Sequence, residues 1–404
     1  MNTSKKSFLP TNRINPEARI DESNPAVQMV ARMVRAGDPL ADALAAKLKE
    51  LGPVGRKQFD EGLANGLASL SDPPEELANL LRHMESFATE IDPDELKKPM
   101  VAVCSIEPIW TQVAFAFASL FHTYSNSAMS RILVSTGRLV EQASHRVAET
   151  DLWQLRVDMP GGSLQGAPGY VSIGQVRVLH SIVRLSLLRK GWDVETWGMP
   201  ISQLDLARTW LDFTLFPYRA LEKLGFDFTP EELSHRYTCW RHIGHLLGID
   251  PELIQHLKNH EDAQELLDLI NLAEDRPDDN CRKLTGALME AMIPVFSSHF
   301  KIPMRLMHDI CHAITRYVCG DQLADDLHVE SPDVLHLMPL FVHDNQMTRY
   351  LLRTNPREWE KYLDANLQAY RARIDELATQ GGQFESFLTK RNHVEPGRNQ
   401  KQWQ

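Results

Sequence analysis

The 404-residue sequence has little cysteine and none of the paired spacings that disulfide or zinc frameworks need. An odd number of cysteines without a C-x-x-C pair fits free thiols in a reducing compartment. Zinc-ribbon and thioredoxin-like folds are therefore excluded, and a cytoplasmic location is expected. The five cysteines are Cys104, Cys239, Cys281, Cys311 and Cys319.

The sequence also lacks an excess of basic residues and a long hydrophobic run near its start. Its formal net charge is −11, whereas nucleic acids and anionic membranes attract basic patches. The first 25 residues carry two lysines but no apolar block of secretory length. We therefore expect no nucleic-acid partner, no signal peptide and no membrane span.

Strand-like alternation is scarce, and no repeat of about 20 to 50 residues is evident. Helix-start signals are abundant instead, because a helix N-cap residue precedes a proline at several places and apolar residues then follow at helical spacing. These pairs are Asn24-Pro25, Asp38-Pro39, Asp72-Pro73 and Asp250-Pro251. The sequence predicts an all-α protein with a single large helical domain.

The two ends of the chain differ in composition from that domain. We expect a disordered segment over 1–22 and a flexible tail over 391–404, because both are polar and have little to bury. Accessory helices are expected over 23–98 and the main domain over 99–390. The glycine-rich loop from Met159 to Gly169 lacks the G-x-x-x-x-G-K-[ST] order that cradles phosphate, which argues against a nucleotide site.

The stretch VRVLHSIVR, residues 176–184, places cationic residues in one of the most apolar runs of the chain. On a helix, Arg177, His180, Ser181 and Arg184 fall within about one third of the circumference. A buried guanidinium group needs a partner. Two interpretations are open: an internal salt-bridge network with a core histidine, or a bound anionic ligand.

A second polar face lies upstream in SHRVAET, residues 144–150. Arg146, Glu149 and Thr150 share one side of their helix because they are three and four residues apart. A solvated surface with a local Arg–Glu pair is one interpretation. If the two helices face each other across a cavity, His180 binds a metal from one side and these three residues face the ligand from the other.

The order of these features resembles the haem-containing family of latex clearing protein, the bacterial rubber oxygenase, with its fungal relatives in mycophenolic acid biosynthesis. The resemblance extends over roughly 105–345 and includes HRVAET, VRVLHSIVR, GMPISQLD and IGHLLGI. It implies globin-like helix packing around a haem pocket, with His180 as the axial ligand of haem b. It also implies that Arg177 and Arg184 flank that ligand, where they would bind the haem propionates, and that Arg146 and Thr150 lie on the distal side.

Glu149 departs from the family pattern, which has a lysine at this position. We expect Glu149 to lie near the iron, held by Arg146 and available as a proton acceptor. The resemblance implies a haem-dependent oxygenase that uses dioxygen on a small apolar substrate, isoprenoid-like or otherwise unsaturated.

Two other functions remain open at this point. A distal carboxylate would also suit a haem carrier or sensor without catalytic activity. A helical non-haem metal protein is the second alternative, because His308 and His312 have the i, i+4 spacing of metal ligands. His235, His242 and His245 are also closely spaced, although core or surface positions explain them as well.

Overall fold

The computed structural model describes residues 7–87, 91–135 and 143–379, and all regular structure in these ranges is helical. This confirms the all-α prediction. The helices are α1 (Pro25–Met33), α2 (Pro39–Asn65), η1 (Leu67–Ser69), α3 (Glu75–Glu85), η2 (Glu95–Lys97), α4 (Val101–Cys104), α5 (Pro108–Ala114), the π-helical η3 (Phe115–Ser119), α6 (Leu120–Ser125), α7 (Ser127–Ser135), α9 (Ala143–Asp158), α10 (Pro168–Arg189), α11 (Val194–Trp197), α12 (Gln203–Thr214), α13 (Phe216–Lys223), α14 (Pro230–Leu246), α15 (Pro251–Ile254), α16 (His260–Ile270), η4 (Asn271–Ala273), α17 (Asp279–Phe300), α18 (Met304–Cys319), α19 (Asp321–Asp326), η5 (Asp333–Leu337), α20 (Met338–Arg353) and α21 (Pro356–Thr379).

Three of the four predicted helix starts are confirmed. Asn24, Asp38 and Asp250 each accept a hydrogen bond from a backbone N–H of the first helical turn, and a proline follows each of them. The prediction at Asp72 is wrong. Helix α3 begins at Glu75 after two prolines, and Asp72 has a left-handed backbone with φ of 51°.

Helix α2 is bent in its middle. Gly52 has φ 59° and ψ −133°, which is accessible to glycine, and Pro53 follows without a backbone N–H to donate. The break divides the helix into two segments, and Asp38 is the N-cap of the first.

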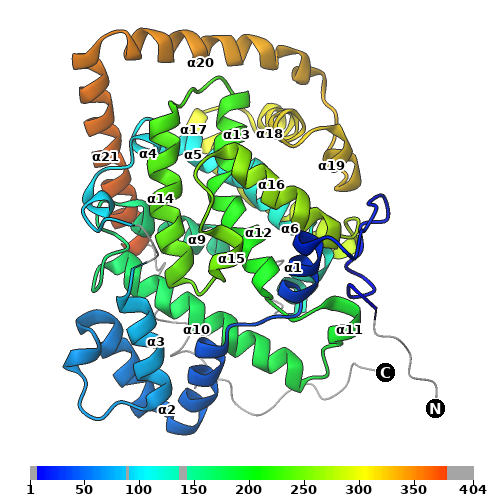
Figure 1. Cartoon of the computed structure of the whole chain (residues 1–404). Helices are drawn as coiled ribbons and strands as arrows, with labels where there is room; N and C mark the ends of the chain where they lie inside the picture. The colour runs from blue at the N-terminus through cyan, green and yellow to red at the C-terminus, as the bar shows by residue number, and fades with distance from the viewer. Residues whose placement is uncertain (1–6, 88–90, 136–142, 380–404) are drawn as a thin grey trace, which may run out of the picture.

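Helix α10 lies between the N-terminal helices α2 and α3 and the remaining bundle (Figure 1). It packs against α2, α9 and α14. One continuous hydrophobic cluster includes Leu44 of α2, Ile173 of α10 and Leu211 of α12. The accessory helices therefore share the core of the main domain and do not form a bundle of their own.

Helix α10 is also the one helix in the described ranges that by itself has the length and mean hydropathy of a membrane span. In this protein α10 carries the buried Arg177 and Arg184 and packs against three neighbouring helices, so it lies in the core.

The expectation of a disordered segment over 1–22 is wrong for residues 7–22. Arg13 is fully buried, and its guanidinium group donates to Asp205 at 2.8 Å and to the Ala273 carbonyl at 2.9 Å. A buried carboxylate thus anchors the segment that composition alone marked as loose. The predicted tail over 391–404 lies outside the described residues.

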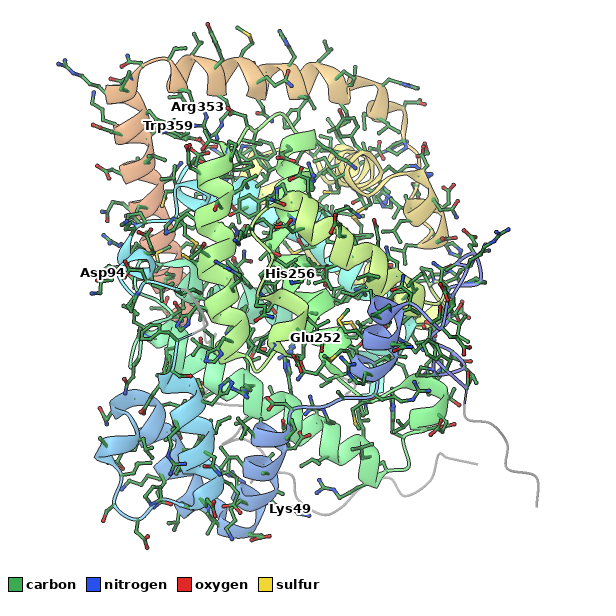
Figure 2. The ribbon with its side chains drawn as sticks, in the orientation of Figure 1. Lys49, Asp94, Glu252, His256, Arg353 and Trp359 are labelled. Atoms are coloured by element: carbon green, nitrogen blue, oxygen red, sulfur yellow. The ribbon has the colours of Figure 1, made fainter. Side chains whose placement is uncertain are left out.

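Helices α20 and α21 form a corner over one end of the molecule (Figure 1). Arg353 contacts the Trp359 ring at 4.4 Å and forms a 2.8 Å ion pair with Glu232, so the corner is tied to α14 (Figure 2).

Candidate functional site

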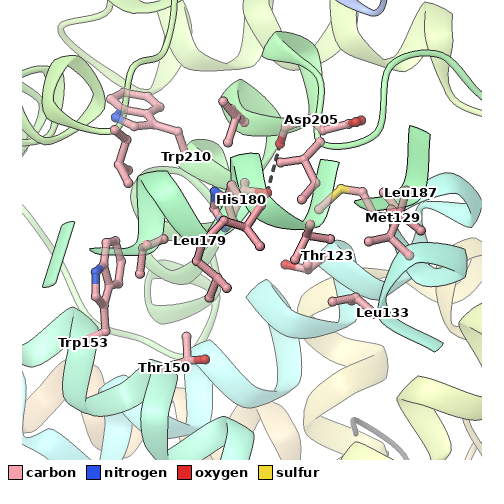
Figure 3. A pocket seen from close by; sticks show the side chains of 18 of the residues that line it. Thr123, Met129, Leu133, Thr150, Trp153, Leu179, His180, Leu187, Asp205 and Trp210 are labelled. Atoms are coloured by element: carbon pink, nitrogen blue, oxygen red, sulfur yellow. Dashed lines mark hydrogen bonds between the residues drawn. The ribbon is translucent and has the colours of Figure 1, made fainter. Parts of the chain in front are cut away.

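A cavity of about 470 Å³ is enclosed chiefly by α7, α9, α10 and α12 (Figure 3). Small-molecule and cofactor sites have volumes of about 300–1,000 Å³ and mainly apolar walls. One face of α10 forms the longest wall. Its lining residues are Val176, Leu179, His180, Ile182, Val183, Ser186, Leu187 and Lys190.

His180 is on this wall and lies between aromatic and aliphatic parts of the lining (Figure 3). Its Nδ1 atom is buried without a hydrogen-bond partner. Burial, followed by the charges of Arg184 and Arg146, lowers the pKa of His180 to about 4. The imidazole is therefore neutral at pH 7, which is the form that ligates a metal.

Arg177 and Arg184 are buried as predicted, but they do not line the cavity. Arg177 forms a bidentate ion pair with Asp38, at 2.7 and 3.1 Å, and also donates to the Leu246 carbonyl at 3.1 Å. Arg184 forms an ion pair with Asp42. Protein carboxylates of the α2 start therefore satisfy both guanidinium groups, and the predicted contact with propionates has no support in this geometry.

The surrounding chain is shaped to these ion pairs. Arg184 donates to the carbonyls of Pro200, at 3.0 Å, and of Ile201, at 2.7 Å. Gly248 has φ +75°, and a Cβ atom there would lie 2.5 Å from both Arg177 Nε and Asp38 Oδ2. Close approach to the ion pair explains the second glycine of the IGHLLGI stretch.

The predicted face of α9 is divided between the cavity and its edge. Arg146 and Thr150 line the cavity, whereas Glu149 is buried but is not part of the lining. Glu149 Oε2 accepts a hydrogen bond from Arg146 Nη1 at 2.8 Å, and Glu149 Oε1 is 3.5 Å from His145 Nδ1. The expected Arg–Glu pair is thus present. The Glu149 carboxylate was expected to face the ligand, but it is not part of the cavity lining.

The polar groups on the cavity wall are mostly engaged by the protein itself. The Thr150 and Thr209 hydroxyls each donate to the backbone carbonyl four residues earlier, at 2.9 Å. The indole N–H of Trp210 donates to the Trp240 carbonyl at 2.7 Å, and that of Trp240 to Asp158 at 2.9 Å. These threonines and tryptophans therefore present mainly apolar surface to a ligand.

The other histidine pairs do not form a metal site. The rings of His308 and His312 are 4.3 Å apart, and His312 Nδ1 accepts from the Glu330 backbone N–H at 2.9 Å. His242 stacks on His245 at 6.3 Å. Within 7–87, 91–135 and 143–379, no three His, Cys, Asp or Glu side chains are grouped to hold a metal ion.

Several lining residues were not predicted from the sequence, among them Met129, Trp153 and Lys190. A signal for the α10 wall is present, because Val176, Val183 and Lys190 recur every seven residues and so share a face. This apolar face is distinct from the cationic face that contains Arg177 and Arg184.

Comparison with known proteins identifies the class to which this fold and site belong. The family model described as "ER-bound oxygenase mpaB/B'/Rubber oxygenase, catalytic domain" matches residues 109–343, which is more than half of the chain. The chain belongs to this family.

Individual relatives are distant. The rubber oxygenase of Streptomyces sp. (strain K30) is 24% identical over 198 residues, which cover 47% of this chain and 45% of that protein. The ER-bound oxygenase mpaB' of Penicillium brevicompactum is 23% identical over 297 residues, covering 71% and 60%. The matches thus span about half of the length of these relatives.

A solved structure agrees with the fold. Latex clearing protein in the closed state superposes with a TM-score of 0.62 at 17% identity, over 84% of this chain and 90% of that one. At 17% identity this similarity shows a shared fold and assigns no role to individual residues.

Proposed function

We propose that the protein is a haem b-dependent oxygenase that acts with dioxygen on a small apolar substrate, isoprenoid-like or otherwise unsaturated. The observation that carries the proposal is His180, a neutral histidine without a hydrogen-bond partner at Nδ1 on the wall of a cavity of about 470 Å³. Membership of an oxygenase family supports the reaction class.

The residues of the cavity fit a haem group. His180 offers an imidazole that no protein group competes for, and the remaining wall is mainly aliphatic and aromatic. When bound, the haem iron supplies the activation of dioxygen. The side chains of this protein would orient the substrate and exclude water.

The aromatic part of the wall gives the cavity a closely packed apolar surface. The Phe213 and Trp240 rings stack at 5.1 Å, and Trp153 meets Phe213 edge-on at 5.2 Å. Such packed rings exclude water and favour an apolar substrate. Burial, followed by the charges of Arg184 and Arg146, lowers the pKa of His180 and keeps the ring unprotonated and therefore available as a ligand.

A haem carrier or sensor is the second candidate. The distal carboxylate that suggested it in the sequence is not on the described wall, because Glu149 is outside the lining. The carrier is favoured instead by the lack of a free proton acceptor for catalysis on that wall, where Asp205 pairs with Arg13 at 2.8 Å. If the protein is an oxygenase, its reaction proceeds without a carboxylate of the described wall as a base.

The test is reconstitution of the purified protein with haem. We expect a Soret band that saturates at one haem per chain, and at least a hundredfold weaker haem binding in His180→Ala. A matched control is the double variant His308→Ala/His312→Ala, which removes the other closely spaced pair and is expected to bind haem normally. Equal haem affinity of His180→Ala and wild type would refute the ligand assignment.

Oxygen consumption then separates the two candidates. With reduced haem protein and an unsaturated isoprenoid such as squalene, we expect oxygen uptake that requires the substrate and product formation by mass spectrometry. Stable haem binding without substrate-dependent uptake across several unsaturated substrates would favour the carrier.

A further inference from the structure

Four side chains on the described cavity wall bear a charge or can bear one: Arg146, His180, Lys190 and Asp205. Three of them are accounted for. Arg146 is paired with Glu149 at 2.8 Å, Asp205 is paired with Arg13 at 2.8 Å, and His180 is neutral. Lys190 is exposed, and the ion pairs formed among the described residues, such as those of Arg146 and Asp205, do not include it. On the described wall it is the cation without an ionic partner.

Lys190 is the C-cap residue directly after α10 and lies ten positions beyond His180. Ten residues of helix correspond to about 15 Å along the axis. Both residues line the same cavity. The wall between the two is formed by Val183, Ser186 and Leu187. A molecule that contacts both ends therefore has an apolar body and one polar end.

We propose that Lys190 binds a carboxylate carried by the molecule that occupies this cavity. The inference rests on the proposed function in that it concerns the same cavity. The two guanidinium groups predicted to bind propionates, those of Arg177 and Arg184, are held by Asp38 and Asp42. Lys190 is the cation left free to take that role. The carboxylate belongs either to a haem propionate or to an acidic apolar substrate.

The first arm of the test asks whether the cofactor supplies the carboxylate. Apoprotein is titrated with ferric protoporphyrin IX and with its dimethyl ester, in wild type, Lys190→Gln and Lys190→Arg. Arg189→Gln is the matched control, because Arg189 is an exposed neighbour that does not line the cavity. A solvent-accessible ion pair is worth up to about 1 kcal/mol, so the acid should bind about fivefold more tightly than the ester.

We expect Lys190→Gln to abolish this preference, while Lys190→Arg and Arg189→Gln retain it. The preference should also decline between low and high salt, as expected for an exposed charge pair.

The second arm asks whether the substrate supplies the carboxylate. Dodecanoate and dodecanol are compared by calorimetry on haem-loaded protein, or on the apoprotein if haem does not bind. A preference for dodecanoate that disappears in Lys190→Gln assigns the carboxylate to the substrate. The proposal is overturned if wild type shows no preference in either arm, or if Lys190→Gln keeps the preference. Absence of haem binding alone would refute the proposed function and leave the second arm to decide about Lys190.

Discussion

Two faces of α10 treat their basic side chains in opposite ways. On the face toward α2, Arg177 and Arg184 are saturated by Asp38, Asp42 and backbone carbonyls. On the face toward the cavity, the Nδ1 atom of His180 has no hydrogen-bond partner. A buried polar atom without a partner lowers the free energy of unfolding. Removal of one partner from a buried ion pair also lowers it, because the other charge is then left unpaired. Protein partners therefore close the first face, and the second is the face that we propose binds a ligand.

The largest expected effect comes from breaking the saturated face at Arg177. Arg177→Met leaves Asp38 buried without its partner, which we expect to lower the free energy of unfolding by about 3–5 kcal/mol. Urea denaturation of the apoprotein measures this. Asp38→Asn/Arg177→Met should recover part of the loss, because no unpaired charge remains.

The same variant separates the two faces in function. Haem affinity of the folded Arg177→Met protein should remain within about twofold of wild type, since Arg177 does not line the cavity. A large loss of haem affinity without a loss of stability would return Arg177 to the cofactor site.

Arg184 should give a smaller effect of the same kind. The Asp42 side chain is 24% exposed, against 6% for Asp38, so water can replace part of the lost interaction. We expect Arg184→Met to cost about 1–3 kcal/mol in urea denaturation. An effect larger than that of Arg177→Met would contradict the ranking of the two ion pairs by burial.

A pH-dependent effect follows from His83 of α3, whose Nδ1 accepts from Arg177 Nη1 at 3.1 Å. Burial and the charge of Arg177 lower the pKa of His83 to about 3, from a usual value of about 6.5. The unfolded chain therefore binds the proton first. Stability is full above pH 6.5 and falls as the pH decreases from there toward 3.

Replacement by glutamine sharpens this prediction, because glutamine can accept a hydrogen bond but does not titrate. We expect His83→Gln to reduce the slope of unfolding free energy against pH, by up to one proton, between pH 6 and 4. Identical slopes for wild type and His83→Gln would show that His83 does not contribute to acid sensitivity.

The site was less predictable from the sequence than the fold, for a physical reason. Capping at Asp38 is a local property and was predicted correctly. Its ion pair with Arg177 joins residues 139 positions apart, and no local pattern reveals that partner. The cationic face of α10 spans about a third of the circumference, which is wide enough to meet two neighbours. For VRVLHSIVR, the interpretation as an internal salt-bridge network holds for the two arginines, whereas His180 at the edge of that network lines the cavity and a bound anionic ligand stays a prediction.

The smallest expected effect on stability is at His180, on the open face. His180→Leu removes a buried Nδ1 that has no partner and replaces the ring by a residue suited to the apolar wall around it. Because no interaction of the apoprotein is lost, we expect its free energy of unfolding to change by less than about 1 kcal/mol, with an increase as the favoured direction. The same variant should lose haem binding, so that stability and ligand binding separate in the sense opposite to Arg177→Met. Urea denaturation of the apoprotein and a haem titration on one preparation measure both quantities. A loss of several kcal/mol in His180→Leu would mean that His180 belongs to the structural network, and the contrast between the two faces of α10 would then be wrong.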